Sequence, residues 1–238
     1  MSYLHEFQEF SNIAKRVALG LLFSLILATF FLSFPSSQSI SSRIFRKMSV
    51  DLVPEGVELV SLSIWSSAIS DMEIAFALGF FCVFPWFAWM AFRYFSPGLY
   101  EHERRTFAKV LAPSFILFLS GAMFAYYFFI SPTFSIMYRF AERLGVKPLI
   151  DVSDFVGTVV MLMIISGIIF LLPIIMLTLN ITGFVDKATW GEYWRHAFFA
   201  FFAFSAVITP DGTGITMLIF TTPMILLYLV GWGLSKRY

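Results

Sequence analysis

Residues 155–185 read FVGTVVMLMIISGIIFLLPIIMLTLNITGFV, a run of 31 residues without a charged side chain. A helix of about 20 apolar residues is long enough to cross a hydrocarbon core about 30 Å thick. Five further charge-free runs follow the same pattern, at residues 17–42, 74–92, 110–138, 197–210 and 212–235. A soluble domain could not bury this much uninterrupted apolar sequence, so the pattern predicts an integral membrane protein.

The composition supports this class of protein. Charged residues make up 13% of the chain, against about 25% in soluble domains. The net charge of +1 gives no overall field that would favour nucleic acid. The single cysteine, Cys82, excludes an intrachain disulfide. The first apolar run has no convincing small-x-small cleavage site, so we expect a retained helix rather than a signal peptide.

We expect an all-α fold, because lipid offers no partner for free backbone N–H and C=O groups. The prediction is one polytopic membrane domain over residues 1–238 with six transmembrane helices. Their expected ranges are 15–35, 72–95, 110–131, 153–180, 196–209 and 213–234. The fifth run has 14 residues, about 21 Å of helix. A re-entrant hairpin with five crossings is therefore the alternative to six crossings with two short members. Four prolines inside these runs predict kinks: Pro85, Pro113, Pro173 and Pro223.

The distribution of lysine and arginine predicts the orientation. With both termini in the cytosol, ten of the 16 basic residues lie on the inner side, which is the side where such residues are usually enriched. Two long outer segments, 36–73 and 131–154, carry apolar and basic residues at helical spacing near Ile44–Phe45 and Met137–Phe140. Here we expect amphipathic helices on the outer surface. Kinked and short helices together predict a cupped, glove-like bundle.

The sequence gives no sign of an enzyme, a metal or a cofactor. It lacks a nucleophile elbow, a zinc-protease motif and a glycine-rich phosphate loop. Its three histidines, His5, His102 and His196, fall at the predicted cytosolic boundary. Solvated boundary histidines are the preferred interpretation, and a shared metal site is the weaker one.

Ionisable residues within the membrane mark ion or proton paths, and the predicted spans contain almost none. Asp71 and Glu73 fall at a predicted outer boundary, and Asp211 falls in a tight outer turn. The pattern therefore argues against a transporter of small solutes.

Acidic residues gather at the predicted inner margin. Glu6 and Glu9 are three residues apart and share a helix face. In the loop at residues 96–105, Tyr100 is expected to anchor at headgroup depth and to hold Glu103 close to the lipid surface. A carboxylate in such surroundings binds a guanidinium more strongly than in water. One interpretation of the arrangement is a receptor for an arginine-rich ligand.

A less specific interpretation of the same residues stays open. Glu103 could pair with Arg104 or Arg105 within the chain, and Glu6 and Glu9 could serve a helix N-terminus. Spacing alone does not decide between these interpretations.

The stretch at residues 76–105, with Pro85 and the segment Phe95-Ser-Pro-Gly-Leu-Tyr-Glu-His-Glu-Arg-Arg, resembles TatC, the receptor subunit of the twin-arginine protein translocase. Further pieces resemble this family in the same order along nearly the whole chain. They are residues 118–132 with Gly121, residues 150–155, residues 167–173, Thr209-Pro210-Asp211 and Pro223.

The resemblance implies a function. TatC binds signal peptides with paired arginines at the cytoplasmic face and works with small single-span TatA/TatB-type subunits. Folded cargo is then exported across the prokaryotic plasma membrane with the energy of the proton gradient. The implied binding residues are Glu103 and Glu6, with Tyr94 and Phe95 at the aromatic position before the loop and Asp211 in the outer turn.

Two departures from the family pattern stand out. Tyr3 and Gln8 occupy the usual His and Arg positions beside Glu6. Leu171 occupies the position where the family often has a fourth-span carboxylate before the proline corresponding to Pro173.

The leading hypothesis is a peptide receptor and assembly scaffold without covalent chemistry. The arginine pair is expected to bind Glu103, assisted by Glu6 and Glu101. Tyr94 and Phe95 are expected either to contact the apolar part of the peptide or to stack on a guanidinium.

Faces of the two short spans are the candidate docking surfaces for single-span partners. The residues expected at partner or structural positions are Phe201, Phe204, Met217, Pro210, Asp211, Pro85 and Pro173. A homo-oligomer within a larger complex stays open. The alternatives in other classes are a solute permease, an intramembrane enzyme and an unrelated structural subunit.

Overall fold

The computed structural model describes residues 15, 19, 22, 23, 26, 40–54, 56–95, 101–145, 147, 149–181, 183–209 and 214–236. For residues 87, 90–95, 101–112 and 187 it describes the backbone only. Most of the predicted first span, Glu6, Pro210 and Asp211 therefore lie outside the description.

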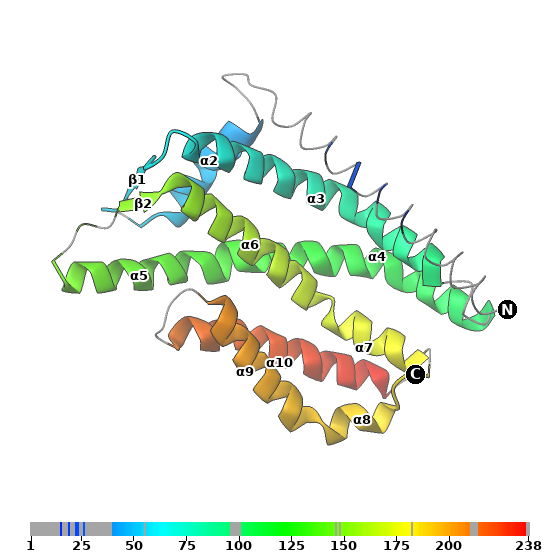
Figure 1. The fold of residues 1–238 in the computed structure, drawn as a ribbon. Helices are drawn as coiled ribbons and strands as arrows, with labels where there is room; N and C mark the ends of the chain where they lie inside the picture. Colours follow the sequence, from blue (N-terminus) through cyan, green and yellow to red (C-terminus); the bar gives the residue numbers. More distant parts are fainter. Residues whose placement is uncertain are drawn as a thin grey trace.

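Helices make up most of the described chain (Figure 1). In order they are α2 (Ile40–Leu52), α3 (Ser66–Phe95), α4 (Glu101–Phe124), the π-helix η2 (Ala125–Ile130), α5 (Ser131–Arg143), α6 (Val152–Phe170), α7 (Leu172–Ile181), α8 (Lys187–Glu192), α9 (Trp194–Ile208) and α10 (Ile215–Ser235). Four segments are long and apolar enough to cross a membrane: Ser66–Trp86, Pro113–Arg143, Val152–Ile181 and Ile215–Ser235. The helix Trp194–Ile208 is apolar but shorter.

The mostly helical prediction is therefore confirmed, with one addition. Two short strands, β1 (Glu58–Val60) and β2 (Leu149–Asp151), form a parallel two-stranded sheet in which Leu59 lies opposite Ile150. Each strand is followed by a long helix, β1 by α3 and β2 by α6. The parallel pairing therefore sets the beginnings of α3 and α6 side by side at one end of the molecule.

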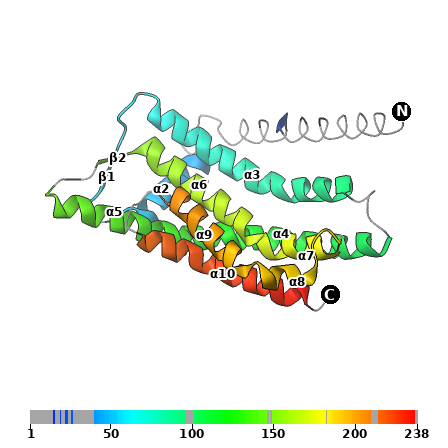
Figure 2. The ribbon, with the colours of Figure 1, turned by 60° about the horizontal axis from the view of Figure 1, so that its bottom comes forward.

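The sheet was not anticipated, because three-residue strands carry too little alternation to be recognised in a sequence. The continuity of α4, η2 and α5 was also missed. The chain stays helical from Glu101 to Arg143 and passes through Pro113 and Pro132 without ending, as Figure 2 shows from a second side.

The core lies where α2, η2, α6 and α10 meet. Phe129, Phe155 and Phe220 each expose no more than 1% of their surface. The ring centroids of Phe129 and Phe220 lie 4.6 Å apart. Helix α2 contributes Met48 and Leu52, which are four residues apart on one face. The amphipathic helix expected around Ile44–Phe45 is thus present, and its apolar face packs on the membrane helices.

Candidate functional site

The predicted binding residues come from two consecutive helices that meet at one end of the bundle. Tyr94 and Phe95 are the last residues of α3, and Glu101 and Glu103 lie in the first turn of α4. We name this end the turn end, and the opposite end, with β1 and β2, the sheet end (Figure 1). The backbone therefore brings four of the five predicted binding positions together, and the fifth, Glu6, lies outside the described residues.

Helix α4 begins at Glu101, and this start helps to decide whether Glu103 forms an ion pair with Arg104 or Arg105. On a helix, residues three and four apart share a face, and adjacent residues do not. Positions 104 and 105 therefore share a face with position 101, and position 103 lies on another face. The helical backbone favours an internal ion pair at position 101 over one at position 103.

A second group of residues at the turn end joins α7, α8 and α10. The indole N–H of Trp190 donates to Oδ1 of Asn180 at 2.8 Å, and the Tyr228 hydroxyl donates to the Trp190 carbonyl at 2.7 Å. The rings of Trp190 and Tyr228 meet edge to face, 6.2 Å apart. These bonds fix α8 against α7 and α10.

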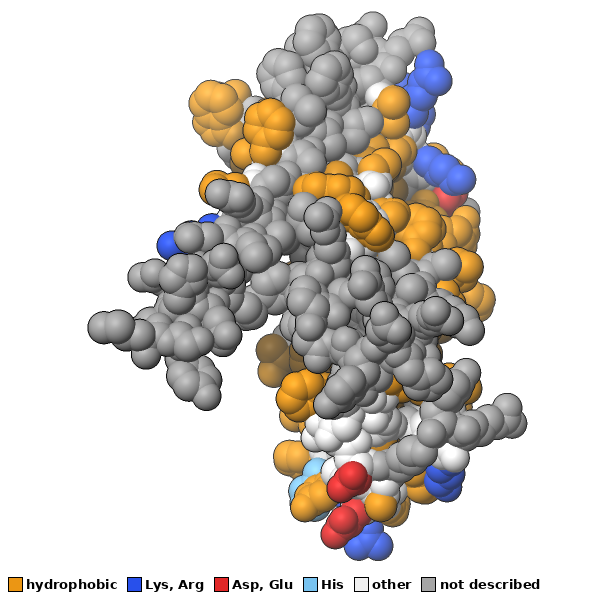
Figure 3. Space-filling view, turned by 90° about the vertical axis from the view of Figure 1, so that its right-hand side faces the viewer, with side chains coloured by type: hydrophobic (Ala, Val, Ile, Leu, Met, Phe, Trp, Pro, Cys, Tyr) orange, Lys and Arg blue, Asp and Glu red, His pale blue; other side chains and the backbone are white. Residues whose placement is uncertain are grey.

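This group was not predicted from the sequence, although tryptophan and tyrosine are enriched at membrane interfaces. Figure 3 shows the turn end, where acidic, basic and histidine side chains of the described residues gather along the edge formed by α8. Further along α10, the Lys236 ammonium lies 4.0 Å from the centroid of the Trp232 ring.

The expected kink at Pro173 is a break between two helices. Helix α6 ends at Phe170 and α7 begins at Leu172. Leu171 lies between them, and its N–H donates to the Ile168 carbonyl at 3.1 Å. Because Pro173 has no N–H, the Ile169 carbonyl loses its usual helical donor. Pro85, by contrast, lies within α3, which continues to Phe95.

The three residues predicted to contact partners on α9 and α10 differ in exposure. Phe201 packs against the core, with its ring 5.8 Å from that of Tyr228. Phe204 is 44% exposed. Met217 is half-buried, and its carbonyl oxygen lies 2.8 Å from the Thr221 hydroxyl oxygen. Only Phe204 of the three presents an open face.

Two buried hydroxyls hold α9 to α10. Thr221 donates to the Ser205 hydroxyl at 2.8 Å, and Ser205 is the buried residue of α9. In an apolar environment such a bond joins helices that lack a hydrophobic driving force between them. Neither residue was predicted from the sequence to join the two helices.

Carboxylates hold the sheet end together by accepting hydrogen bonds from hydroxyl groups. The Tyr126 hydroxyl donates to Asp51 at 2.8 Å, and the Ser41 hydroxyl donates to Asp71. The first bond joins α2 to η2, and the second joins α2 to α3. These carboxylates therefore tether α2 to the membrane helices.

Asp151 is bound by groups from three positions in the chain. It accepts hydrogen bonds from the hydroxyls of Ser153 (2.7 Å) and Ser66 (2.9 Å) and from the backbone N–H of Leu62 (3.1 Å). The bond from Ser153, followed by that from Leu62, holds the pKa of Asp151 below its usual range. The carboxylate joins the start of α6 to the start of α3.

Glu73 is an ionisable residue of the apolar segment Ser66–Trp86. Helix α3 begins at Ser66, so Glu73 lies two turns inside the helix. Its Oε2 atom is buried without a hydrogen-bond partner among the described residues. A Cβ added at Gly157 of α6 would lie 3.2 Å from Oε1 of Glu73, so the glycine provides the space for this carboxyl group.

Within the described residues, no group of three or more His, Cys, Asp or Glu side chains is placed to hold a metal ion. Cys82 is a free, exposed thiol.

Comparison with known proteins gives a consistent result. The sequence profile of the family described as Sec-independent protein translocase protein (TatC) matches residues 9–223. Sec-independent protein translocase protein TatC of Cenarchaeum symbiosum is 32% identical over 84% of this chain and 75% of its own length. The TatC protein of Aquifex aeolicus is 30% identical over 76% of this chain and 75% of its own length.

Solved structures share the fold. The crystal structure of the twin arginine translocase receptor TatC in DDM matches with a TM-score of 0.81 at 23% sequence identity, covering 95% of this chain and 99% of that one. A second crystal structure of that receptor matches with a TM-score of 0.78 at 22% identity, covering 96% of this chain and 98% of that one.

Proposed function

Since the chain belongs to the TatC family, we propose that it is the receptor and core subunit of a twin-arginine translocase, binding paired-arginine signal peptides at the turn end. The family is a component of a protein translocase and not an enzyme family. Its members work with other Tat subunits in the membrane, so protein translocation is the role of this chain.

The position of Glu103 is the observation that carries the proposal. It lies in the first turn of α4, on a helix face other than that of Arg104 and Arg105. The end of α3, with Tyr94 and Phe95, lies at the same end of the bundle. Glu103 accepts the guanidinium pair, assisted by Glu6 and Glu101, and the two aromatic residues contact the apolar part of the peptide.

The proposal includes a membrane orientation. The chain crosses the plasma membrane of a prokaryote six times, with both termini and the turn end in the cytoplasm and the sheet end outside. Four described segments are long and apolar enough for a crossing, and α9 is the short fifth crossing, which thins the adjacent lipid. The bundle forms a cupped wall rather than a sealed channel.

Peptide binding to the purified full-length chain tests the receptor site. Replacing one charged hydrogen-bonding partner costs about 1.5–3 kcal/mol, so Glu103→Gln is expected to weaken binding of an Arg-Arg signal peptide by about ten- to a hundredfold. A Lys-Lys peptide should bind the unaltered chain weakly, because lysine lacks the planar fork of arginine. Isothermal titration in detergent measures both effects.

Glu192→Gln is the matched control, because Glu192 is an exposed carboxylate at the same end of the bundle but on α8. It should bind the Arg-Arg peptide as the unaltered chain does. Equal affinities for the Glu103→Gln and Glu192→Gln variants would remove the receptor assignment from position 103.

Docking of small single-span subunits is proposed for the exposed side of α9, around Phe204. Phe199 and Val207 extend this face and are 77% and 86% exposed. A photo-crosslinking residue at position 204 is expected to trap a small partner in membranes. The control is the same photo-crosslinking residue in place of Ile116 of α4, which is 64% exposed. Equal trapping at both positions would mean that α9 has no special role.

A further inference from the structure

Helix α5 presents an unusual surface at the sheet end. Met137, Phe140 and Leu144 follow one another at helical spacing and are 41%, 45% and 80% exposed. Arg139 and Arg143, four residues apart, are exposed along one side of this apolar stripe.

The charges of this segment are separated around the helix axis. At about 100° per residue, the two arginines border Phe140, and Glu142 lies beyond them, away from the stripe. The Arg143 guanidinium carbon lies 5.7 Å from the centroid of the Phe140 ring. Helix α5 thus combines an apolar stripe with a flanking pair of cations.

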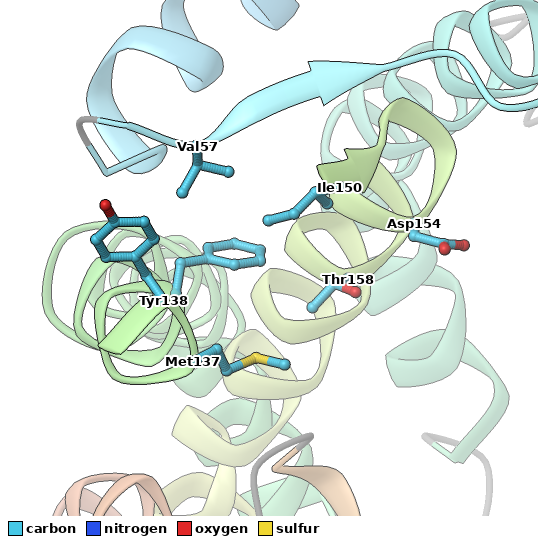
Figure 4. Close-up of a pocket in the computed structure, with 7 residues that line it drawn as sticks. Val57, Met137, Tyr138, Ile150, Asp154 and Thr158 are labelled. Carbon is cyan, nitrogen blue, oxygen red and sulfur yellow. The ribbon is translucent and has the colours of Figure 1, made fainter. Parts of the chain in front are cut away.

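The stripe leads into a pocket of about 250 Å³. The pocket lies between α5, α6 and the chain before β1, and it is lined by Val57, Phe134, Met137, Tyr138, Ile150, Asp154 and Thr158. Figure 4 shows the Asp154 carboxylate directed away from Met137 and Tyr138, so the space between the helices is bordered mainly by apolar atoms. Met137 belongs to both the pocket and the stripe.

The length of the helix places this surface at the edge of the bilayer. The apolar segment Pro113–Arg143 has 31 residues, about 46 Å of helix, whereas the hydrocarbon core measures about 30 Å. Even with the usual tilt of about 20°, the last turns of α5 extend into the headgroup layer. The pocket, lined by Phe134 and Thr158, lies closer to the hydrocarbon.

We propose that this surface is a binding site for one anionic phospholipid of the sheet-end leaflet. One acyl chain follows Phe140 and Met137 into the pocket, and the headgroup phosphate is bound by Arg139 and Arg143. Guanidinium groups bind phosphate oxygens in a planar, bidentate manner. The pocket-lining residues Phe134 and Met137 precede Arg139 and Arg143 along the helix axis, as the acyl chain precedes the headgroup of a lipid across a leaflet. The proposal does not depend on signal-peptide binding.

Native mass spectrometry of the full-length chain tests the site. The protein is titrated with phosphatidylglycerol and with phosphatidylcholine of the same acyl chains. We expect one phosphatidylglycerol to bind in preference to phosphatidylcholine. The double variant Arg139→Gln/Arg143→Gln should bind it about thirtyfold more weakly, since each basic residue near an anionic headgroup contributes about fivefold.

The double variant Arg46→Gln/Lys47→Gln is the matched control, because it removes the same charge from exposed positions on α2. It should retain the phosphatidylglycerol.

The variant Thr158→Phe tests the pocket, because the larger side chain fills it. It should weaken binding of long-chain phosphatidylglycerol but not of dihexanoyl phosphatidylglycerol. The melting temperature of the variant checks that it is folded.

Three outcomes would overturn the proposal. Unaltered protein that binds the two lipids equally has no anionic site. Equal loss of phosphatidylglycerol in both double variants makes the attraction a general effect of charge. If the unaltered chain is a dimer and the Arg139→Gln/Arg143→Gln variant is a monomer that still binds phosphatidylglycerol, the surface is an interface between two copies of the chain.

Discussion

Helices α6 and α9 are both strongly apolar, yet they occupy opposite situations in the molecule. Helix α6 buries seven residues and packs against α3, α4, η2 and α7. Helix α9 buries Ser205 alone and packs chiefly on α10 and α8. An apolar composition alone therefore does not show whether a helix lies at the centre or at the periphery of a membrane bundle. What differs is the shape of the contact surface.

The contact between α6 and α4 is reciprocal. Gly121 of α4 makes room for the Phe170 ring of α6, and Gly167 of α6 makes room for the Phe118 ring of α4. A Cβ added at Gly121 would lie 2.6 Å from the Ser166 carbonyl oxygen. Small residues allow helix backbones to approach closely in lipid, where dispersion contacts replace the hydrophobic effect.

The largest effect is expected from closing this contact. Gly121→Ala places a methyl group against backbone that cannot move aside, and overpacking of this kind costs about 1–3 kcal/mol. The variant should unfold at a clearly lower temperature in detergent. Circular dichroism at 222 nm during heating measures the change.

Gly233→Ala in α10 is the matched control, since nothing lies within 4 Å of a Cβ added there. Alanine is favoured over glycine in a helix by about 1 kcal/mol, so this variant should be as stable as the unaltered chain or more so. A Gly121→Ala variant that behaves like Gly233→Ala would mean that α4 and α6 do not interlock.

The sequence was sufficient to predict helices and the family but not the contacts between them. Charge-free runs locate α6, α9 and α10, because lipid requires every backbone group to be bonded internally. The sequence cannot show that Gly121 faces Phe170, because that contact depends on how two distant segments cross.

The candidate site was predictable to a similar degree. The motif around Glu103 carries the resemblance, and α4 begins there. The roles of the carboxylates at the sheet end were not predicted, because each accepts a hydrogen bond from a hydroxyl group of a distant segment. Asp151 and Ser66, for example, are separated by 85 residues.

The attachment of the peripheral helix α9 to α10 is expected to depend on one polar contact, between Ser205 and Thr221. Thr221→Val keeps the side-chain shape but removes the hydroxyl that donates to Ser205. Hydrogen bonds between membrane helices contribute about 0.6 kcal/mol on average and at most about 1.7. The variant should therefore be only slightly less stable, while proteolysis or crosslinking detects greater separation of α9 from α10.

Thr222→Val provides the comparison within the same turn. The Thr222 hydroxyl bonds to the Leu218 carbonyl of its own helix, so its loss leaves α9 in place. If both variants release α9 to the same extent, the Ser205–Thr221 bond has no specific role in holding the peripheral helix.

The smallest effect concerns the start of α6 and should appear only in acid. The hydrogen bonds to Asp151 lower its pKa in the folded protein. Their contribution to stability is therefore complete above the ordinary aspartate value of about 4 and is lost as the pH falls through the lowered folded value. Asp151→Asn keeps a carbonyl acceptor but does not titrate, so between pH 3 and 6 its melting temperature should fall less than that of the unaltered chain.

Asp186→Asn is the control, because Asp186 begins α8 without a side-chain capping bond. Parallel curves for all three proteins would show that Asp151 does not couple α6 to α3, and the central position of α6 would then depend on apolar packing alone.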